Sequence, residues 1–224
     1  MKNIEYFEKL KRHYERRDVI EYFNDFLIFS RTNSLLILDC GSGIGYLSKT
    51  LTLCGKQVIS IDINSYMLRY AKKELRLSDV ICGSACNVPI RDAVVDAIFF
   101  IDVIEHLDEP LEGLKELKRV LKPEGSFFLV TPNGLYRKIT SRLLMQLLGP
   151  THVHEFTWKE ICELVRKAGL RISRSRSAGI PLLNKLSFKA SRRVAKYLFF
   201  LLPLSSPSFW IELRKEKKRE GWFG

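Results

Sequence analysis

The sequence predicts an α/β fold in which helices cover both faces of a seven-stranded, mostly parallel sheet, giving three layers. Short apolar runs with the length of buried strands alternate with segments whose apolar residues recur at helical spacing. Strands that are covered on both faces are continuous apolar runs of this kind. With 224 residues, of which 46% are hydrophobic, the chain can bury a full core as one domain.

The first half of the chain predicts two N-terminal helices and then alternating strands and helices. Apolar residues at helical spacing fill 3–30, with a break near 16–18. Strands are expected at 35–38, 57–61 and 80–82, and helices at 44–54 and 65–75. Gly55 is expected to end the first of these helices, and Ser65 to cap the start of the second.

The second half predicts four more strands. These are expected at 94–101, 126–131, 170–177 and 209–214, with helices at 110–121, 135–148, 157–168 and 184–202. Lys122-Pro123-Glu124-Gly125 predicts a turn before the fifth strand. Thr157 and Glu160 predict a capping box. We expect the last pair of strands not to be simply parallel.

We expect a single domain, because no repeat or low-complexity linker divides the chain. A helical cap is expected at 1–34, the core at 35–177, and a basic, apolar helix with the last strand at 178–224. The formal net charge is +12, and from Arg171 onward thirteen Lys or Arg face three Glu. Such a tail suits an anionic membrane or a nucleic-acid backbone, and a solubilising face equally well. The oligomeric state is left open.

Cysteine spacing and hydropathy favour a cytoplasmic protein. The five cysteines lie apart without zinc-type spacing, so reduced thiols are expected. The charged N-terminus lacks the apolar core of a signal peptide. The longest apolar run, 197–204, is far shorter than the about 20 residues that cross a bilayer. Peripheral contact with an anionic membrane stays an open alternative.

The stretch LLILDCGSGIGYLS at 35–48 is the centre of the expected fold. A strand, a glycine-rich turn and the start of a helix form a backbone that approaches a ligand closely. The spacing Gly41-x-Gly43-x-Gly45 differs from the dinucleotide fingerprint, because Tyr46 stands where the third glycine of that fingerprint would be.

Two carboxylates near this turn indicate the charge of the ligand. Asp39 would repel a pyrophosphate but neutralise an ammonium group, directly or through water. Asp62 ends the second strand, where a carboxylate binds both hydroxyls of a ribose. The sequence therefore favours a ligand with a ribose and an amino-acid tail and without a phosphate.

These residues resemble the S-adenosylmethionine-dependent methyltransferases of the Rossmann-like class (class I), in their small-molecule type. The likeness continues through DAIFFIDVIEHL at 96–107 and RVLKPEG at 119–125, and covers about residues 30–177. It implies a Rossmann-like fold, methyltransferase activity and S-adenosyl-L-methionine as cofactor. The cofactor-binding residues that it implies are Asp39, Gly41, Ser42, Gly43, Gly45, Asp62, Ile63, Ser84, Ala85, Ile101 and Asp102.

One position departs from the family pattern in the loop expected to hold the adenine. The family commonly has Gly-Asp-Ala-x-x-Leu-Pro-Phe there, and this chain has GSACNVPI at 83–90. Ser84 replaces the acid that usually accepts a hydrogen bond from the adenine amino group. A hydroxyl accepts that bond without charge assistance, so we expect cofactor binding to survive.

The expected catalytic residues follow the fourth strand. Asp102-x-x-Glu105-His106 is similar to the Glu-x-x-Glu-His of ubiquinone-biosynthesis O-methyltransferases, which is associated with a divalent cation. No metal is expected; the alternative is that these three residues hold a hard cation. Glu105 alternatively closes the cofactor pocket, as in family members that use no metal. The Asn-Pro-Pro-Tyr motif of base amino-group methylation is missing at this edge.

A second candidate lies in the segment 152–157, HVHEFT, where related enzymes line the acceptor pocket. His154 is expected to act as a general base, alongside His106 and Glu105, or else to pack against the sheet. We therefore expect O-methylation of a small apolar or lipid-like acceptor. The alternative is an RNA- or protein-directed methyltransferase that docks through the basic tail.

Overall fold

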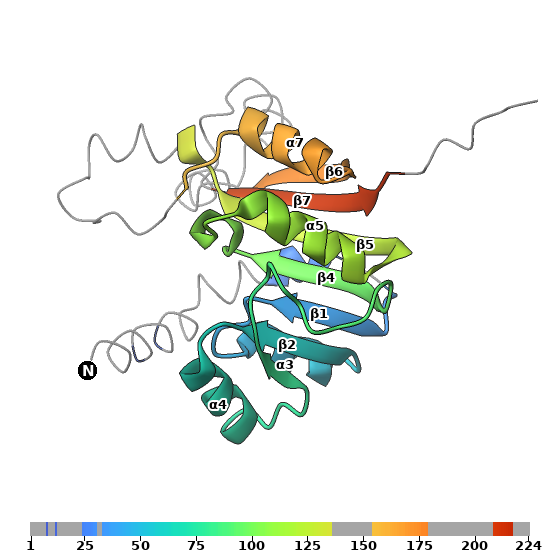
Figure 1. Ribbon diagram of the computed structural model, residues 1–224. Helices are drawn as coiled ribbons and strands as arrows, with labels where there is room; N and C mark the ends of the chain where they lie inside the picture. The colour runs from blue at the N-terminus through green and yellow to red at the C-terminus, as the bar shows by residue number, and fades with distance from the viewer. Residues whose placement is uncertain are drawn as a thin grey trace, which may run out of the picture.

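A seven-stranded sheet with the order β3-β2-β1-β4-β5-β7-β6 forms the centre of the computed structural model, which describes residues 8, 12, 24–30, 33–135, 154–178 and 208–216 (Figure 1). The first five strands pair in parallel, and β7 is antiparallel to both β5 and β6. The predicted sheet is thereby confirmed. The strands are β1 (Leu36–Cys40), β2 (Gln57–Asp62), β3 (Val80–Cys82), β4 (Val95–Ile101), β5 (Leu121–Pro132), β6 (Leu170–Ala178) and β7 (Ser208–Lys215).

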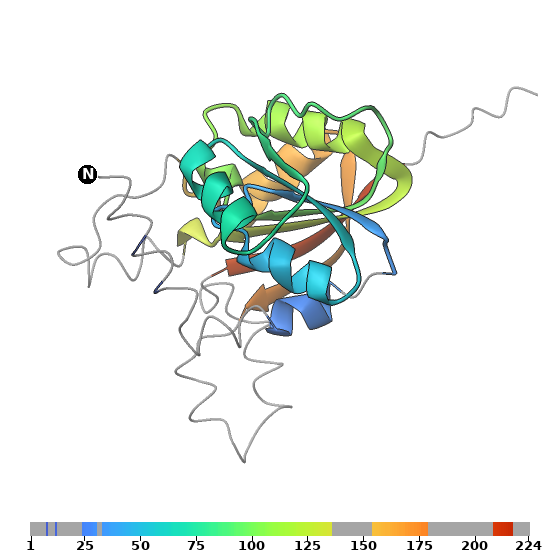
Figure 2. The same cartoon turned by 90° about the horizontal axis from the view of Figure 1, so that it is seen from below.

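Helices cover both faces of the sheet. Figure 2 shows α5 and α7 over one face, and α3 with the helical residues 24–29 over the other. The named helices are α3 (Tyr46–Leu53), α4 (Ser65–Lys73), the 3-10 turn η1 (Ile104–His106), α5 (Pro110–Val120) and α7 (Trp158–Lys167). Within the described ranges, no helix combines the length and the apolar character that crossing a membrane requires. The helix predicted at 184–202, all but the first residue of the helix predicted at 135–148, and most of 3–23 lie outside the described residues.

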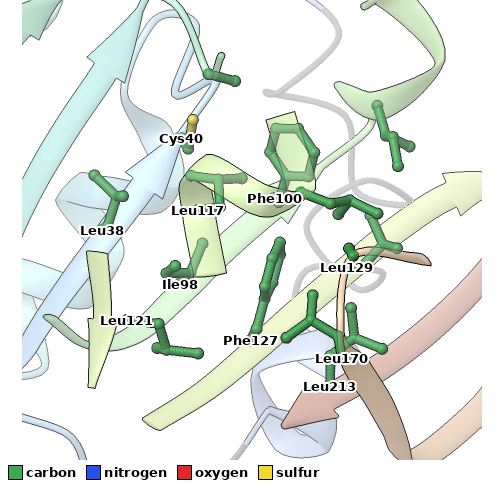
Figure 3. Close-up of a cluster of buried hydrophobic side chains, with 14 of the residues drawn as sticks. Leu38, Cys40, Ile98, Phe100, Leu117, Leu121, Phe127, Leu129, Leu170 and Leu213 are labelled. Carbon is green, nitrogen blue, oxygen red and sulfur yellow. The ribbon is translucent and has the colours of Figure 1, made fainter. Parts of the chain in front are cut away.

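Two apolar layers hold the helices to the sheet, because alternate residues of each strand face opposite sides. Ile98 and Phe100 point into the layer under α5 and α7, where Leu117 packs against them (Figure 3). Phe99 points to the other side, where it meets Phe26 edge to face with ring centroids 5.7 Å apart. The near-continuous apolar run of β4 is therefore buried on both faces, as its sequence predicts.

The structure corrects two local predictions. Asn64, and not Ser65, caps α4, because its side chain accepts hydrogen bonds from the amides of Tyr66 and Met67 at 3.0 and 3.3 Å. The segment 122–125 is an irregularity inside β5 and does not precede it. Residue 121 pairs with 95 and residue 126 with 97, so Asp96 alone faces the four residues between.

A bulge in β6 gathers arginines on one face of the sheet. Ile172 pairs with Leu213 and Arg174 with Glu212, so Ser173 is the extra residue, and Arg171, which pairs with Arg214, lies on the same face as Arg174. Glu212 is 7% exposed and forms ion pairs with Arg174 and Arg214 at 2.9 and 2.7 Å. Two cations of the basic tail thus neutralise a buried carboxylate, which reduces the charge that the tail offers to a partner.

We predict that Asn64→Ala lowers the free energy of unfolding by about 1 kcal/mol, because two amides of the first turn of α4 lose their acceptor. The neighbouring Ser65→Ala is the matched control and should change it by less than about 0.5 kcal/mol, since Ser65 is exposed. Urea unfolding of both variants measures the difference. Equal costs for the two would contradict the cap that the structure shows.

Candidate active site

The predicted cofactor residues meet at the carboxyl edge of the sheet. The strand order reverses between β1 and β4. From β1 the chain adds β2 and β3 on one side of the sheet, and from β4 it adds β5 on the other side. Ligands of open α/β sheets bind outside the strand ends at such a reversal. Asp39 lies at the end of β1, Asp62 at the end of β2, and Asp102 directly after β4.

The glycine turn uses each of its three glycines differently. All three have positive φ, at 79°, 54° and 84° for Gly41, Gly43 and Gly45. A Cβ on Gly41 would collide with the side chain of Val103, and one on Gly45 would lie 2.9 Å from Ala71. A Cβ on Gly43 would meet nothing within 4 Å. Gly41 and Gly45 therefore permit packing, and Gly43 faces open space.

Asp62 fixes the glycine turn to the end of β2. Its two carboxylate oxygens accept hydrogen bonds from the amides of Gly43 and Asn64, at 2.7 and 2.8 Å. The amides of Gly41 and Ser42 donate to the carbonyl of Ile61, at 2.7 and 3.0 Å. Each carboxylate oxygen keeps a second lone pair, so Asp62 can still accept bonds from two ribose hydroxyls.

Asp39 lies behind the turn in a buried polar chain. Its carboxylate accepts a hydrogen bond from Ser48 of α3 at 2.6 Å, and Ser48 accepts one from Ser60 of β2 at 2.7 Å. Burial raises the pKa of Asp39 to about 6, against the hydrogen bond from Ser48, and the charge of Asp62 raises it further. Neither serine is among the residues predicted for the site, although a serine inside the apolar run VISI is a signal for a buried polar contact.

Asp102 has a strained backbone at the end of β4. Its φ of 53° is unusual for a residue with a side chain, and such strain concentrates at functional sites. Its amide donates to the carbonyl of Val130 at 3.0 Å, and the next residue, Val103, packs on Gly41. The side chain is exposed, yet desolvation by the surrounding chain raises its pKa to about 6. Asp102 therefore lies beside the glycine turn.

The remaining predicted cofactor residues line the same edge. Ile63 is 78% exposed after β2, Ala85 is 7% exposed, and Ile101 is half-buried at the end of β4. The Ser84 hydroxyl accepts a hydrogen bond from the amide of Cys86 at 3.1 Å. It keeps one proton and one lone pair for the adenine amino group or ring.

Glu105 connects η1 to its surroundings. Its side chain is 1% exposed and accepts a hydrogen bond from Thr131 of β5 at 3.2 Å. Its carbonyl accepts the amide of His154 at 2.9 Å, which brings that histidine to this edge. Among the residues that the structure covers, no group of three His, Cys, Asp or Glu is placed to hold a metal ion, so Asp102, Glu105 and His106 are not assembled as a cation site.

The two candidate bases have different surroundings. His106 is exposed, and partial desolvation lowers its pKa. His154 stacks on Phe156 with ring centroids 5.5 Å apart, and its buried Nε2 makes no hydrogen bond within the described chain. His154 also lines a hollow of about 260 Å³ beside α7. Three glutamates and a lysine line that hollow, so it gives no support for an apolar acceptor.

The arrangement fits S-adenosyl-L-methionine. The space over Gly43 leaves room for a ligand against the backbone, and the buried Ser42 hydroxyl has no hydrogen-bond partner in the described ranges. Asp62 lies close enough to Asp39 that its charge raises the pKa of Asp39. Such a pair attracts a cation and repels a phosphate. A ligand with an ammonium, a sulfonium and a ribose satisfies these groups.

Comparison with known proteins agrees with this geometry. Residues 38–129 match the model of a family described as methyltransferase domain. This chain contains a methyltransferase domain. The fold and the relatives of this domain are similar to those of the Rossmann-like, S-adenosylmethionine-dependent methyltransferases, and this likeness implies S-adenosyl-L-methionine as the cofactor. The narrower likeness of the domain to ubiquinone-biosynthesis O-methyltransferases stays a prediction.

Relatives of the methyltransferase domain share about half of their own length with this chain. A probable S-adenosylmethionine-dependent methyltransferase of Mycolicibacterium smegmatis is 30% identical over 136 residues, covering 61% of this chain and 52% of that protein. A malonyl-(acyl-carrier protein) O-methyltransferase of Yersinia pestis is 29% identical over 121 residues, covering 54% and 45%. A solved S-adenosylmethionine-dependent methyltransferase of Archaeoglobus fulgidus shares the fold, with a TM-score of 0.70 at 19% identity over 94% of this chain and 99% of that one.

We predict that Gly43→Ala weakens binding of S-adenosylhomocysteine at least tenfold, because its Cβ projects into the open space over the turn. Gly55→Ala is the matched control. Gly55 also has positive φ, at 78°, and a Cβ there would meet nothing within 4 Å, but it lies at the end of α3 away from the site. Both variants should lose about 1 kcal/mol of stability from the left-handed backbone. Calorimetric titration of both separates strain from steric exclusion. Equal dissociation constants would show that the ligand does not approach Gly43.

We predict that affinity for S-adenosylhomocysteine rises with pH and levels off above about pH 6. Without ligand, the raised pKa of Asp39 means that the folded chain binds this proton more tightly than the unfolded chain. Stability of the ligand-free domain therefore falls as pH rises from about 4 through 6. A bound ammonium group favours the ionised carboxylate, so binding at pH 6 releases protons.

Calorimetry in buffers of different ionisation enthalpy measures this release. Ser48→Ala should move the midpoint to higher pH, because the hydrogen bond that lowers the pKa of Asp39 is lost. An affinity that stays constant between pH 5 and 8 would rule out a role for this carboxylate.

Proposed function

We propose that this domain transfers a methyl group from S-adenosyl-L-methionine to an oxygen of a small apolar or lipid-like acceptor, with His106 as general base. The observation that carries the proposal is the state of His106. It is exposed at the end of η1, the 3-10 turn that follows β4, and its pKa is lowered, so the imidazole is mostly uncharged at pH 7. A neutral imidazole accepts the proton that a hydroxyl loses on methylation.

The chain supplies positioning and proton acceptance for this reaction. Bound S-adenosyl-L-methionine supplies an electrophilic methyl group on a sulfonium. The glycine turn and Asp62 would hold it at the ends of β1 and β2, and Asp39 would balance its charge. Glu105 keeps η1 against β5 through Thr131, and thereby fixes the backbone that carries His106.

Two observations favour an oxygen of a small molecule as the methyl acceptor over RNA or protein. The Yersinia pestis relative is named an O-methyltransferase, although its acceptor is a property of that protein. Arg174 and Arg214 of the basic tail are engaged with Glu212 within the fold. Fewer tail cations are then available for docking a nucleic acid, which the alternative requires.

We predict that His106→Gln lowers kcat by about 10²- to 10⁴-fold, because the base is lost, and leaves the dissociation constant of S-adenosylhomocysteine unchanged. Transfer of labelled methyl from the cofactor to extracted lipids, RNA and protein measures activity and identifies the acceptor class. Activity of the unaltered chain should rise with pH to a half-maximum below the 6.5 of an ordinary histidine.

His154→Gln is the companion variant, because this histidine reaches the same edge from another segment. If His154→Gln loses turnover while His106→Gln keeps its turnover, His154 is the base and the assignment of His106 is wrong. Label that enters RNA or protein and not the lipid fraction would refute the proposed acceptor class.

A further inference from the structure

We propose that Glu116 and Arg119 of α5 are positioning residues that hold the adenine loop in its binding conformation. The inference rests on the proposed use of S-adenosyl-L-methionine and names residues that act on it through the loop. The loop between β3 and β4, residues 83–94, contains no helix or strand of its own. Apart from a bridge between Ser84 and Asn87 and a tight turn at 88–90, its conformation depends on contacts from outside.

Arg119 donates hydrogen bonds to the loop on both sides of Pro89. Its Nη2 donates to the carbonyl of Val88 and its Nη1 to the carbonyl of Ile90, both at 2.9 Å. Glu116 completes the contact, because its Oε1 accepts the amide of Val88 at 2.9 Å. Both backbone polar groups of Val88 are thus bound by α5, and its side chain is 2% exposed in the core.

The two side chains also hold each other. The Nε and Nη2 of Arg119 donate to the two carboxylate oxygens of Glu116, each at 2.8 Å. This bidentate pair and the Val88 amide lower the pKa of Glu116, so the carboxylate stays charged. Asp92, further along the loop, accepts another bond from Arg119. An exposed i,i+3 pair alone would contribute little, whereas this one also binds three loop residues.

The expected adenine contacts lie between two anchors. At the start of the loop, the amide of Gly83 donates to the carbonyl of Asp62 at 3.0 Å. At the far end, Val88 is bound by α5. Ser84 and Ala85 lie between them and are therefore aligned with the residue expected to bind the ribose. Releasing Val88 would leave this span held by the Gly83 amide, by its own bridge between Ser84 and Asn87, and by the weak contact of the Cys86 thiol with the carbonyl of Glu109.

A released loop would have to be ordered again when the cofactor binds. Ordering one backbone residue costs enough free energy to weaken binding about tenfold. The ligand itself need not touch Arg119 or Glu116 for this effect. Loss of the pair is therefore expected to weaken cofactor binding and to lower the hydrogen-exchange protection of the loop. It should change kcat at saturating cofactor only slightly.

The test compares Arg119→Lys, Arg119→Gln and Glu116→Gln with Arg214→Gln as matched control. Arg214 also joins a glutamate to two backbone carbonyls, those of Glu124 and Gly125, but it does so from β7 and away from the loop. Calorimetry with S-adenosylhomocysteine measures affinity, and hydrogen exchange of the ligand-free chain measures protection of amides 84–90.

The loop variants should raise the dissociation constant about tenfold and expose these amides, and ligand should restore their protection. Arg214→Gln should change affinity less than twofold. Unchanged affinity in Arg119→Lys and Glu116→Gln overturns the inference, and so does a loop that stays protected in them. If the unaltered chain itself does not bind S-adenosylhomocysteine, the proposed function fails, and hydrogen exchange alone then decides whether the pair orders the loop.

Discussion

The carboxylate of Asp62 is the group on which the site depends most. It accepts one amide from the glycine turn and one from the turn into α4, so it joins the ends of β1 and β2 into a single rigid edge. Because hydrogen bonds to an ionised acceptor are about twice as strong as neutral ones, this link holds the flexible glycine turn in one conformation. The ligand-binding edge is therefore formed before any ligand arrives, which limits the entropy lost on binding.

Charge is the second constraint on this edge. Three aspartates end or follow neighbouring strands. Desolvation raises the pKa values of Asp39 and Asp102 to about 6, and at Asp39 the charge of Asp62 raises the pKa further. A protein stabilises itself by separating like charges, so this concentration costs stability unless a cation is bound. The same feature disfavours nicotinamide dinucleotides, whose phosphates would meet the carboxylates. Selection of the cofactor thus depends on the electrostatic potential of the site as much as on its shape.

Much of the fold could be predicted from the sequence, because strand composition and glycine spacing are local properties. The turn at 41–45 and the capping box at Thr157 are both present where the residues indicate. The chain of Ser60, Ser48 and Asp39 could not be predicted, because it depends on which face of α3 meets β2. The predicted N-cap of α4 is wrong by one residue. Asn64 and Ser65 have similar preferences for the N-cap position, and where β2 ends determines which of them starts the helix.

The bulge at Ser173 has a consequence for the behaviour of the protein in solution. β6 is the last strand of the sheet, and an edge strand with free backbone groups is a template for pairing with another molecule. Here the ladder is interrupted, and Arg171, Arg174 and Arg176 follow the edge on one side. At the opposite edge, β3 has only three residues. Both edges of the sheet are thereby protected against edge-to-edge aggregation. The β6 edge is protected by its arginines and its bulge, and the β3 edge by the shortness of that strand.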